Sequence, residues 1–288
     1  MPATGPSRAV LRRRRVGAAV LLAVAGGGVW AAAAQLEPPE VLRTERCTAT
    51  VGSDSYDLTP VQAQNAALIA GVAVVRGLPA RAASIAIATA VQESRLENID
   101  YGDDAGPDSR GLFQQRPSQG WGTEAQVMDP LYAAGAFYDA LVRIPGYETL
   151  PITDAAQRVQ RSAYPTAYAD HEPEGRAFAS ALTGQSPAAL TCVLRKASGP
   201  GDPAAVAAAA ERIFGPLGGA ADGDALVVPA TEPGGWTTAS WAVANADALS
   251  ITKVSFAGQA WTRASGEWSP TPTDAGNLTI TVAGDPAS

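Results

Sequence analysis

The chain has 288 residues, of which 46% are hydrophobic and 17% are charged, and its formal net charge is −7. This composition excludes an intrinsically disordered protein and supplies enough apolar residues for a buried core. Because five of the 21 basic residues fall in the first 34 positions, the rest of the chain holds 16 basic and 28 acidic residues, a net charge of −12. Such a body repels polyanions, so nucleic acid is not an expected partner.

The first 34 residues have the pattern of an export signal. Four arginines at 12–15 precede 19 uncharged, mostly apolar residues at 16–34. This pattern predicts a signal peptide, cleaved after the alanines at 32–34, or an uncleaved N-terminal membrane anchor, because the run approaches the ~20 residues that span a bilayer. A buried helix is the remaining alternative. The export reading makes the rest of the chain extracytoplasmic, either secreted or anchored to the cell membrane.

The two cysteines, Cys47 and Cys192, fit an oxidising compartment. An even count in an exported chain favours one disulfide between them. Two cysteines and a single histidine at these spacings give little basis for a metal site. The sequence therefore predicts a disulfide, no metal and no cofactor.

Composition and periodicity divide the chain into five parts. They are the N-terminal segment 1–34, a polar lead-in at 35–60, a helical domain at 61–195, a Gly- and Pro-rich linker at 196–235 interrupted by one short Ala-rich helix, and a small α/β domain at 236–284. Within the helical domain, apolar spacing and end signals predict helices at 61–77, 80–96, 130–144, 153–162 and 174–182. Residues 98–109 are rich in Gly and Asp and are expected to form a loop. The last domain is expected to begin with an amphipathic helix, followed by a strand, a hairpin and a final strand.

Glu93 stands at the end of the predicted helix 80–96, directly before the acidic loop. A carboxyl group in a partly dry pocket has its pKa raised and can act as a general acid near neutral pH, as cleavage of a glycosidic bond requires. Amide and aromatic side chains that suit a sugar-binding groove follow within about 40 residues: Gln114, Gln115, Trp121 and Tyr132. Leu112 and Phe113 are expected to point into the core behind Glu93, while Gln114, Gln115 and Trp121 border the groove.

The acidic loop offers candidates for a second carboxylate. An inverting hydrolase needs such a group ~6.5–9.5 Å from the acid, and a retaining enzyme needs one closer. Asp104 and Asp108 lie nearest the following Gly-Leu-Phe-Gln motif and are the leading candidates. Turn formation or a weak calcium site is the simpler interpretation of such a cluster. His171, the single histidine, gives little support for a Ser-His-Asp triad.

Two motifs carry a family resemblance. Ala-Val-Gln-Glu-Ser at 90–94 and Gly-Leu-Phe-Gln-Gln at 111–115 resemble the lysozyme-like lytic transglycosylases. The Asp-Pro pair at 129–130 and the segment at 159–171 are similar to later blocks of that family, and the resemblance covers about 110 residues. It implies a mainly α lysozyme-like domain acting on peptidoglycan glycan strands. It also implies Glu93 as the sole catalytic acid, with Ser94, Gln114 and Tyr164 or Tyr168 as substrate-binding residues. The chain departs from the family pattern where Phe113 replaces methionine and Pro165 replaces asparagine.

The C-terminal residues resemble a small domain found on some secreted actinobacterial cell-wall hydrolases. The expected fold class is therefore a mainly α lysozyme-like domain followed by a small α/β domain. The expected activity is cleavage of β-1,4 glycosidic bonds by a transglycosylase or muramidase reaction. The alternative is a non-catalytic protein that binds the cell wall or serves as a scaffold. The tail tryptophans are expected to pack in a core more readily than to stack on sugars: Trp236, Trp241, Trp261 and Trp268.

Overall fold

The computed structural model describes residues 44–285, apart from residues 105, 163–165 and 274. Thr44–Ser288 forms one compact unit. The predicted signal peptide or anchor, 1–34, and the lead-in as far as residue 43 lie outside the described residues. In the part of the chain that is described, none of the helices combines the length and apolar character needed to cross a bilayer.

Two antiparallel strands, β1 (Arg46–Val51) and β2 (Asp54–Leu58), open the described chain. Polar and apolar residues alternate along β1, and Cys47 and Ala49 are buried on one face. Alternate residues of a strand point to opposite faces, so this spacing turns one side of β1 toward the core. The turn between the strands uses Gly52 at a φ of 67°, a conformation that glycine adopts without steric cost. The lead-in expected at 35–60 therefore contains a hairpin.

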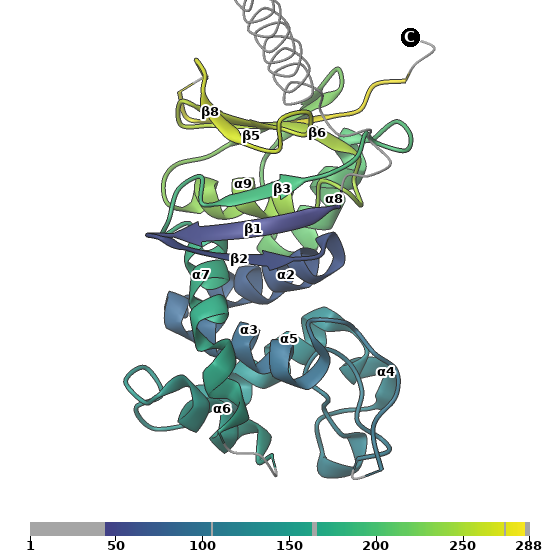
Figure 1. Ribbon diagram of the computed structural model, residues 1–288. Helices are drawn as coiled ribbons and strands as arrows, with labels where there is room; N and C mark the ends of the chain where they lie inside the picture. Colours follow the sequence, from purple (N-terminus) through teal and green to yellow (C-terminus); the bar gives the residue numbers. More distant parts are fainter. Residues whose placement is uncertain (1–43, 105, 163–165, 274, 286–288) are drawn as a thin grey trace, which may run out of the picture. The chain divides into compact units, whose positions relative to one another are not determined.

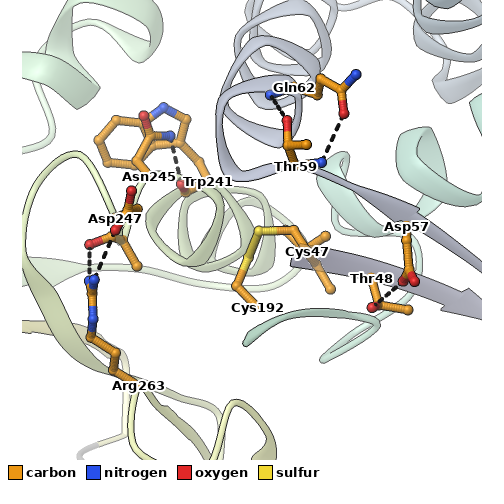
Figure 2. Close-up of a disulfide and its surroundings, with 12 residues drawn as sticks. Cys47, Thr48, Asp57, Thr59, Gln62, Cys192, Trp241, Asn245, Asp247 and Arg263 are labelled. Atoms are coloured by element: carbon orange, nitrogen blue, oxygen red, sulfur yellow. Dashed lines mark hydrogen bonds and ion pairs between the residues drawn. A yellow bond between two sulfur atoms is a disulfide. The ribbon is translucent and has the colours of Figure 1, made fainter. Parts of the chain in front are cut away.

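The central part of the chain is helical. Each of the five predicted helices is present, with ends within a few residues of the expected ones. The helical elements are α2 (Pro60–Val75), α3 (Ala80–Ser94), η2 (Pro117–Gln119), α4 (Glu124–Val127), α5 (Pro130–Leu141), α6 (Ile152–Gln160), η3 (Ala167–His171) and α7 (Glu172–Leu182). A capping box starts α2, where the Thr59 hydroxyl accepts from the Gln62 backbone N–H and the Gln62 side chain accepts from the Thr59 N–H (Figure 2).

The predicted disulfide between Cys47 and Cys192 is confirmed. Strand β3 (Leu190–Val193) follows α7 and pairs antiparallel with β1, so the two cysteines lie directly opposite each other with their Cα atoms 4.0 Å apart. Figure 2 shows the bridge beneath the start of α2, and both cysteines are fully buried. The bridge joins β1 to β3, the strands of this sheet that come first and last in the sequence, and the two cysteines are 145 positions apart. An oxidised pair of this kind is consistent with an extracytoplasmic location.

The region after β3 is rich in strands. Its elements are α8 (Pro203–Phe214), β4 (Ala220–Asp222), β5 (Ala225–Pro229), α9 (Gly234–Ala244), β6 (Ile251–Phe256), β7 (Gln259–Thr262), β8 (Trp268–Pro270) and β9 (Asn277–Val282). The strands form one antiparallel sheet in the order β4-β5-β9-β6-β7-β8. The interval interpreted as a linker, 196–235, holds the Ala-rich helix expected there, which is α8, and also two strands of this sheet. The strand, hairpin and final strand expected after residue 250 are present.

Helix α9 is buried on every side, in contrast to the amphipathic helix expected there. It packs against α2, β3 and β6. Because no side of the helix faces solvent, it has no polar face. Trp236, Trp241 and Trp261 are buried in this core, and the Trp268 indole N–H donates to the Leu190 carbonyl at 2.7 Å. The tail tryptophans therefore serve in packing, the more favoured of the two roles considered for them.

The expected fold class, a mainly α lysozyme-like domain followed by a small α/β domain, is wrong. The described residues form a mixed α/β protein of eight α-helices, two short 3₁₀ helices and nine strands in two sheets, with a β-rich C-terminal region. Strands β1, β2 and β3 enclose the helical segment in sequence, and α2 packs against α8 and α9 of the later region. Strand β1 pairs with β3 more than a hundred residues later, and β5 pairs with β9 at the end of the sheet region, so these short strands leave only a weak local pattern.

Within this unit, α3 lies at the centre of the helices. Figure 1 shows the six-stranded sheet above α9 and the three-stranded sheet, with α2, α3, α5 and α6 below them. Helix α3 packs most extensively against α7 and also contacts α2, α5, α6 and η3. The C-terminal end of α3 is therefore surrounded by elements from distant parts of the chain, and this end carries Glu93.

Candidate active site

The C-terminal end of α3 is held by side chains of α2. Arg95 and Leu96 follow the helix with φ of 55° and 57°, a left-handed conformation that is unfavourable for residues other than glycine. The Gln62 side-chain amide donates to the Arg95 carbonyl at 2.8 Å, and that of Asn65 donates to the Leu96 carbonyl at 2.7 Å. These bonds satisfy carbonyls that the helix leaves free, and they fix the turn just after Glu93.

The segment 111–115 is joined to the end of α3 through Ser94, the residue after Glu93. Leu112 and Phe113 are fully buried, as expected, and the Phe113 ring stacks on Phe137 of α5 with ring centroids 4.7 Å apart. The Ser94 hydroxyl donates to the Leu112 carbonyl at 2.8 Å, and the Gln160 side-chain amide donates to the Phe113 carbonyl at 2.8 Å. The two sequence motifs are therefore joined in space by Ser94 and by the last residue of α6.

The Glu93 carboxyl group is half-buried and hydrogen-bonded. The Tyr168 hydroxyl, which comes from η3, donates to Glu93 Oε1 at 2.6 Å. Burial raises the pKa of Glu93 above the ordinary value for a glutamate. Hydrogen bonds from Tyr168 and Gln160 oppose that shift because they favour the ionised form, and the negative charge of Asp103 reinforces it. A carboxyl group with a raised pKa retains its proton to higher pH, which is the property required of a general acid.

Tyr168 itself is buried, and burial beside the Glu93 carboxylate raises the pKa of its phenol. The phenol therefore remains a proton donor in the hydrogen bond, and Glu93 remains the acceptor.

Replacement of Tyr168 with phenylalanine is expected to raise the pKa of Glu93 further, since it removes a bond that stabilises the carboxylate. If glycan cleavage requires protonated Glu93, the fall in rate at high pH should then move to higher pH. Tyr138→Phe is the matched control, because its buried hydroxyl donates to the Ile69 carbonyl at 2.9 Å and does not bond to Glu93. A pH–rate profile that moves to lower pH in Tyr168→Phe, or moves equally in both variants, would contradict this role.

The remaining sequence-predicted binding residues differ in their placement. Ser94 is buried, and its hydroxyl bonds to the Leu112 and Ala90 carbonyls, so it positions the 111–115 segment. Gln115 is only 1% exposed and donates to the Ala133 carbonyl at 3.0 Å, which places it in the core and not at a groove. Gln114 and Trp121 are half-buried and partly reachable by solvent. Tyr164 lies outside the described residues.

The acidic loop is organised by its own hydrogen bonds. Bonds from Ser118, through its hydroxyl and its backbone N–H, and from Arg116 hold the pKa of Asp108 well below its usual range. Its two carboxylate oxygens accept from the Ser118 N–H at 2.9 Å and from Arg116 Nε at 2.8 Å. Asp108 therefore ties the loop to the segment after 115, while Asp104 is exposed. These bonds give Asp108 a structural role in holding the loop.

Two residues near Glu93 were not selected from the sequence. Gln160 bonds to both Phe113 and Glu93, yet at the end of a helix it carries no distinguishing pattern. The charge of Asp103 contributes to raising the pKa of Glu93, although Asp104 and Asp108 lie nearer the Gly-Leu-Phe-Gln motif in sequence. Its Oδ1 accepts from the Gly106 N–H at 2.8 Å, which fixes the carboxylate within the loop. Which residues lie near Glu93 depends on how α6 and the acidic loop fold back onto α3.

His171 and Glu174 form a separate polar pair beside the site. His171 Nε2 lies 3.0 Å from Gln92 Oε1, and its Nδ1 lies 3.9 Å from the Glu174 carboxylate. Burial lowers the pKa of His171 and raises that of Glu174, so both shifts favour the neutral forms. Within the described ranges, no group of three or more His, Cys, Asp or Glu side chains is arranged to hold a metal ion.

The site thus combines a half-buried carboxyl group of raised pKa with a phenol donor, an amide donor and a buried Leu-Phe pair behind it. Comparison with models of known families and with curated protein sequences finds no match to this chain.

Proposed function

We propose that this protein cleaves β-1,4 glycosidic bonds in peptidoglycan glycan strands, with Glu93 as the general acid. The observation that carries the proposal is the half-buried Glu93 carboxyl group, whose pKa is raised by burial and whose Oε1 accepts the Tyr168 hydroxyl at 2.6 Å. Support also comes from the resemblance of residues 90–94 and 111–115 to lytic transglycosylases, two segments that the Ser94 hydroxyl joins. Export through residues 1–34, with the body of the chain secreted or anchored outside the membrane, belongs to the same proposal.

In the proposed reaction, protonated Glu93 donates its proton to the glycosidic oxygen as the bond to the anomeric carbon breaks. The carboxylate that remains is stabilised by the Tyr168 and Gln160 donors. In a transglycosylase, the 2-acetamido group and a hydroxyl of the same sugar complete the reaction, so no second protein carboxylate is required. The engagement of Asp108 with Arg116 and Ser118 favours this route over hydrolysis by a carboxylate pair.

Digestion of purified peptidoglycan tests the proposal. Incubation with the full chain is expected to release soluble fragments, and mass spectrometry should find anhydro ends if the transglycosylase route operates. Reducing ends would instead identify hydrolysis. An intact, folded protein that binds the wall and releases no fragments would replace this proposal with the non-catalytic alternative.

A further inference from the structure

A cavity of about 480 Å³ lies beside η3, apart from the residues that contact Glu93. Strand β2, helix η3 and the first turns of α7 form its walls. The lining residues that bear on its chemistry are Asp54, Tyr56, Ala169, Glu172, Pro173 and Arg176. Strand β2 lies outside the segments that resemble lytic transglycosylases, so the wall that it contributes belongs to this chain's own N-terminal hairpin.

The cavity presents one aromatic face and fixed polar groups. Tyr56 is half-buried and packs against the core, and its backbone pairs with Ala49 in the sheet, so the ring is held in place. Arg176 Nε donates to Glu172 Oε1 at 2.7 Å, while the Arg176 side chain remains 54% exposed. Because a guanidinium has five N–H donors, this pairing orients Arg176 and leaves donors for a ligand.

These groups match the chemistry of a sugar. The C–H face of a pyranose is apolar and packs on an aromatic ring such as that of Tyr56, because both surfaces leave water on contact. Sugar hydroxyls accept from a guanidinium and donate to carboxylates, and the exposed carboxylate of Asp54 lines the cavity. The charged groups that line the cavity are Arg176, Asp54 and Glu172, and their mixed charges do not favour a strongly charged ligand.

Helix η3 connects this cavity to Glu93. Tyr168 donates its hydroxyl to Glu93, and the next residue, Ala169, lines the cavity. Consecutive Cα atoms are about 3.8 Å apart, so the two contact regions share one short segment of backbone. At the other end of η3, His171 lies against Gln92, the neighbour of Glu93. Glu93 and the cavity are therefore linked through η3, which contacts the end of α3 at Tyr168 and His171 and lines the cavity at Ala169.

We infer that a glycan strand bound at Glu93 extends into this cavity, which holds sugar residues remote from the bond that is cleaved. This inference rests on the proposed function and adds a second contact region for the same substrate. Contacts made far from the reacting bond accelerate the reaction only for substrates long enough to reach them. The preference for long over short strands is therefore the property that Tyr56 and Arg176 control.

The test compares Tyr56→Ala with Tyr56→Phe in the full chain, on long glycan strands and on short oligosaccharides that span only the cleaved bond and its neighbours. In Tyr56→Ala, the ratio of kcat/KM on long strands to that on short ones is expected to fall by about tenfold, because the stacking face is lost. Tyr56→Phe keeps the ring and should keep the preference. Arg176→Gln, at an exposed position, is expected to lower the ratio in the same direction.

An unchanged ratio in both Tyr56→Ala and Arg176→Gln, with wild-type circular dichroism, would overturn the inference while leaving the proposed function intact. If the wild-type protein cleaves no strand of any length, the proposed function fails. Binding to peptidoglycan then tests whether the cavity contacts glycan. Sedimentation with insoluble peptidoglycan then compares Glu93→Gln with the double variant Glu93→Gln, Tyr56→Ala. Weaker retention of the double variant supports the glycan contact, and equal retention rejects it.

Discussion

Replacement of Glu93 with glutamine is expected to reduce glycan cleavage by ~10²-fold or more while leaving the fold intact. Glutamine keeps the size of the side chain and a carbonyl oxygen for the Tyr168 hydroxyl, so packing at the end of α3 should change little. It cannot donate an acidic proton to the glycosidic oxygen. Release of soluble fragments from peptidoglycan measures the loss, and circular dichroism checks that the helices persist.

Asp108→Asn provides a control for this experiment, because it also neutralises a carboxylate in the same region but at a group already bound to Arg116 and Ser118. A Glu93→Gln protein that retains wild-type cleavage would remove Glu93 from the mechanism. A loss of equal size in both variants would point to a damaged loop and not to a missing acid.

Removal of the disulfide is expected to cost about 4 to 5 kcal/mol in the free energy of unfolding, the chain-entropy value for closing a loop longer than a hundred residues. Cys47 and Cys192 are 145 positions apart, and both are buried, so alanine at both positions avoids introducing polar atoms into the core. Denaturant unfolding of the double variant and of the oxidised wild type measures the difference. A difference below about 1 kcal/mol would show that the bridge adds little beyond the β1–β3 pairing.

The loss is also expected to affect the site indirectly. Strand β1 packs against α7, and α7 follows η3, the helix that carries Tyr168. A protein that loses the bridge should therefore show earlier unfolding around Tyr168 than around the six-stranded sheet. Hydrogen exchange of η3 and β6 amides compares the two regions.

The helices near the site could be predicted because their signals are local. Asp129 precedes Pro130 and caps α5, and the run of apolar residues in α3 supplies the buried stretch from Ala82 to Ala90. The burial of Leu112 and Phe113 was expected because they are apolar and a partly dry pocket for Glu93 needs an apolar wall. These features need no information about the rest of the chain.

The sheets required information that is not local. Strand β1 is held by β3, which lies more than a hundred residues later, and β5 pairs with β9 from the end of the chain. A strand of a few residues gains its stability from such partners, so its own sequence resembles a lead-in or a linker. This is why the expected fold class missed the mixed α/β architecture.

The partners of Glu93 also depend on contacts between distant parts of the chain, so most of them could not be predicted from local sequence. Tyr168 was proposed through the family resemblance, whereas Gln160 and Asp103 reach Glu93 only because α6 and the acidic loop fold back onto α3. Gln115, an amide expected at the groove, turned inward because the Ala133 carbonyl offers it a buried partner. The residue types in the sequence indicate the chemistry of the candidate site, whereas tertiary contacts determine which residues lie in it.

The most direct test of Glu93 as the general acid is an NMR titration of its side-chain carboxyl carbon, assigned by comparison with Glu93→Gln. The expected result is a midpoint above that of an ordinary glutamate, because burial and the charge of Asp103 outweigh the Tyr168 and Gln160 bonds. The same midpoint should coincide with the pH at which glycan cleavage falls as pH rises, because the proton is then lost. A midpoint at or below the ordinary value, or cleavage that persists at pH values where Glu93 is fully ionised, would contradict the assignment.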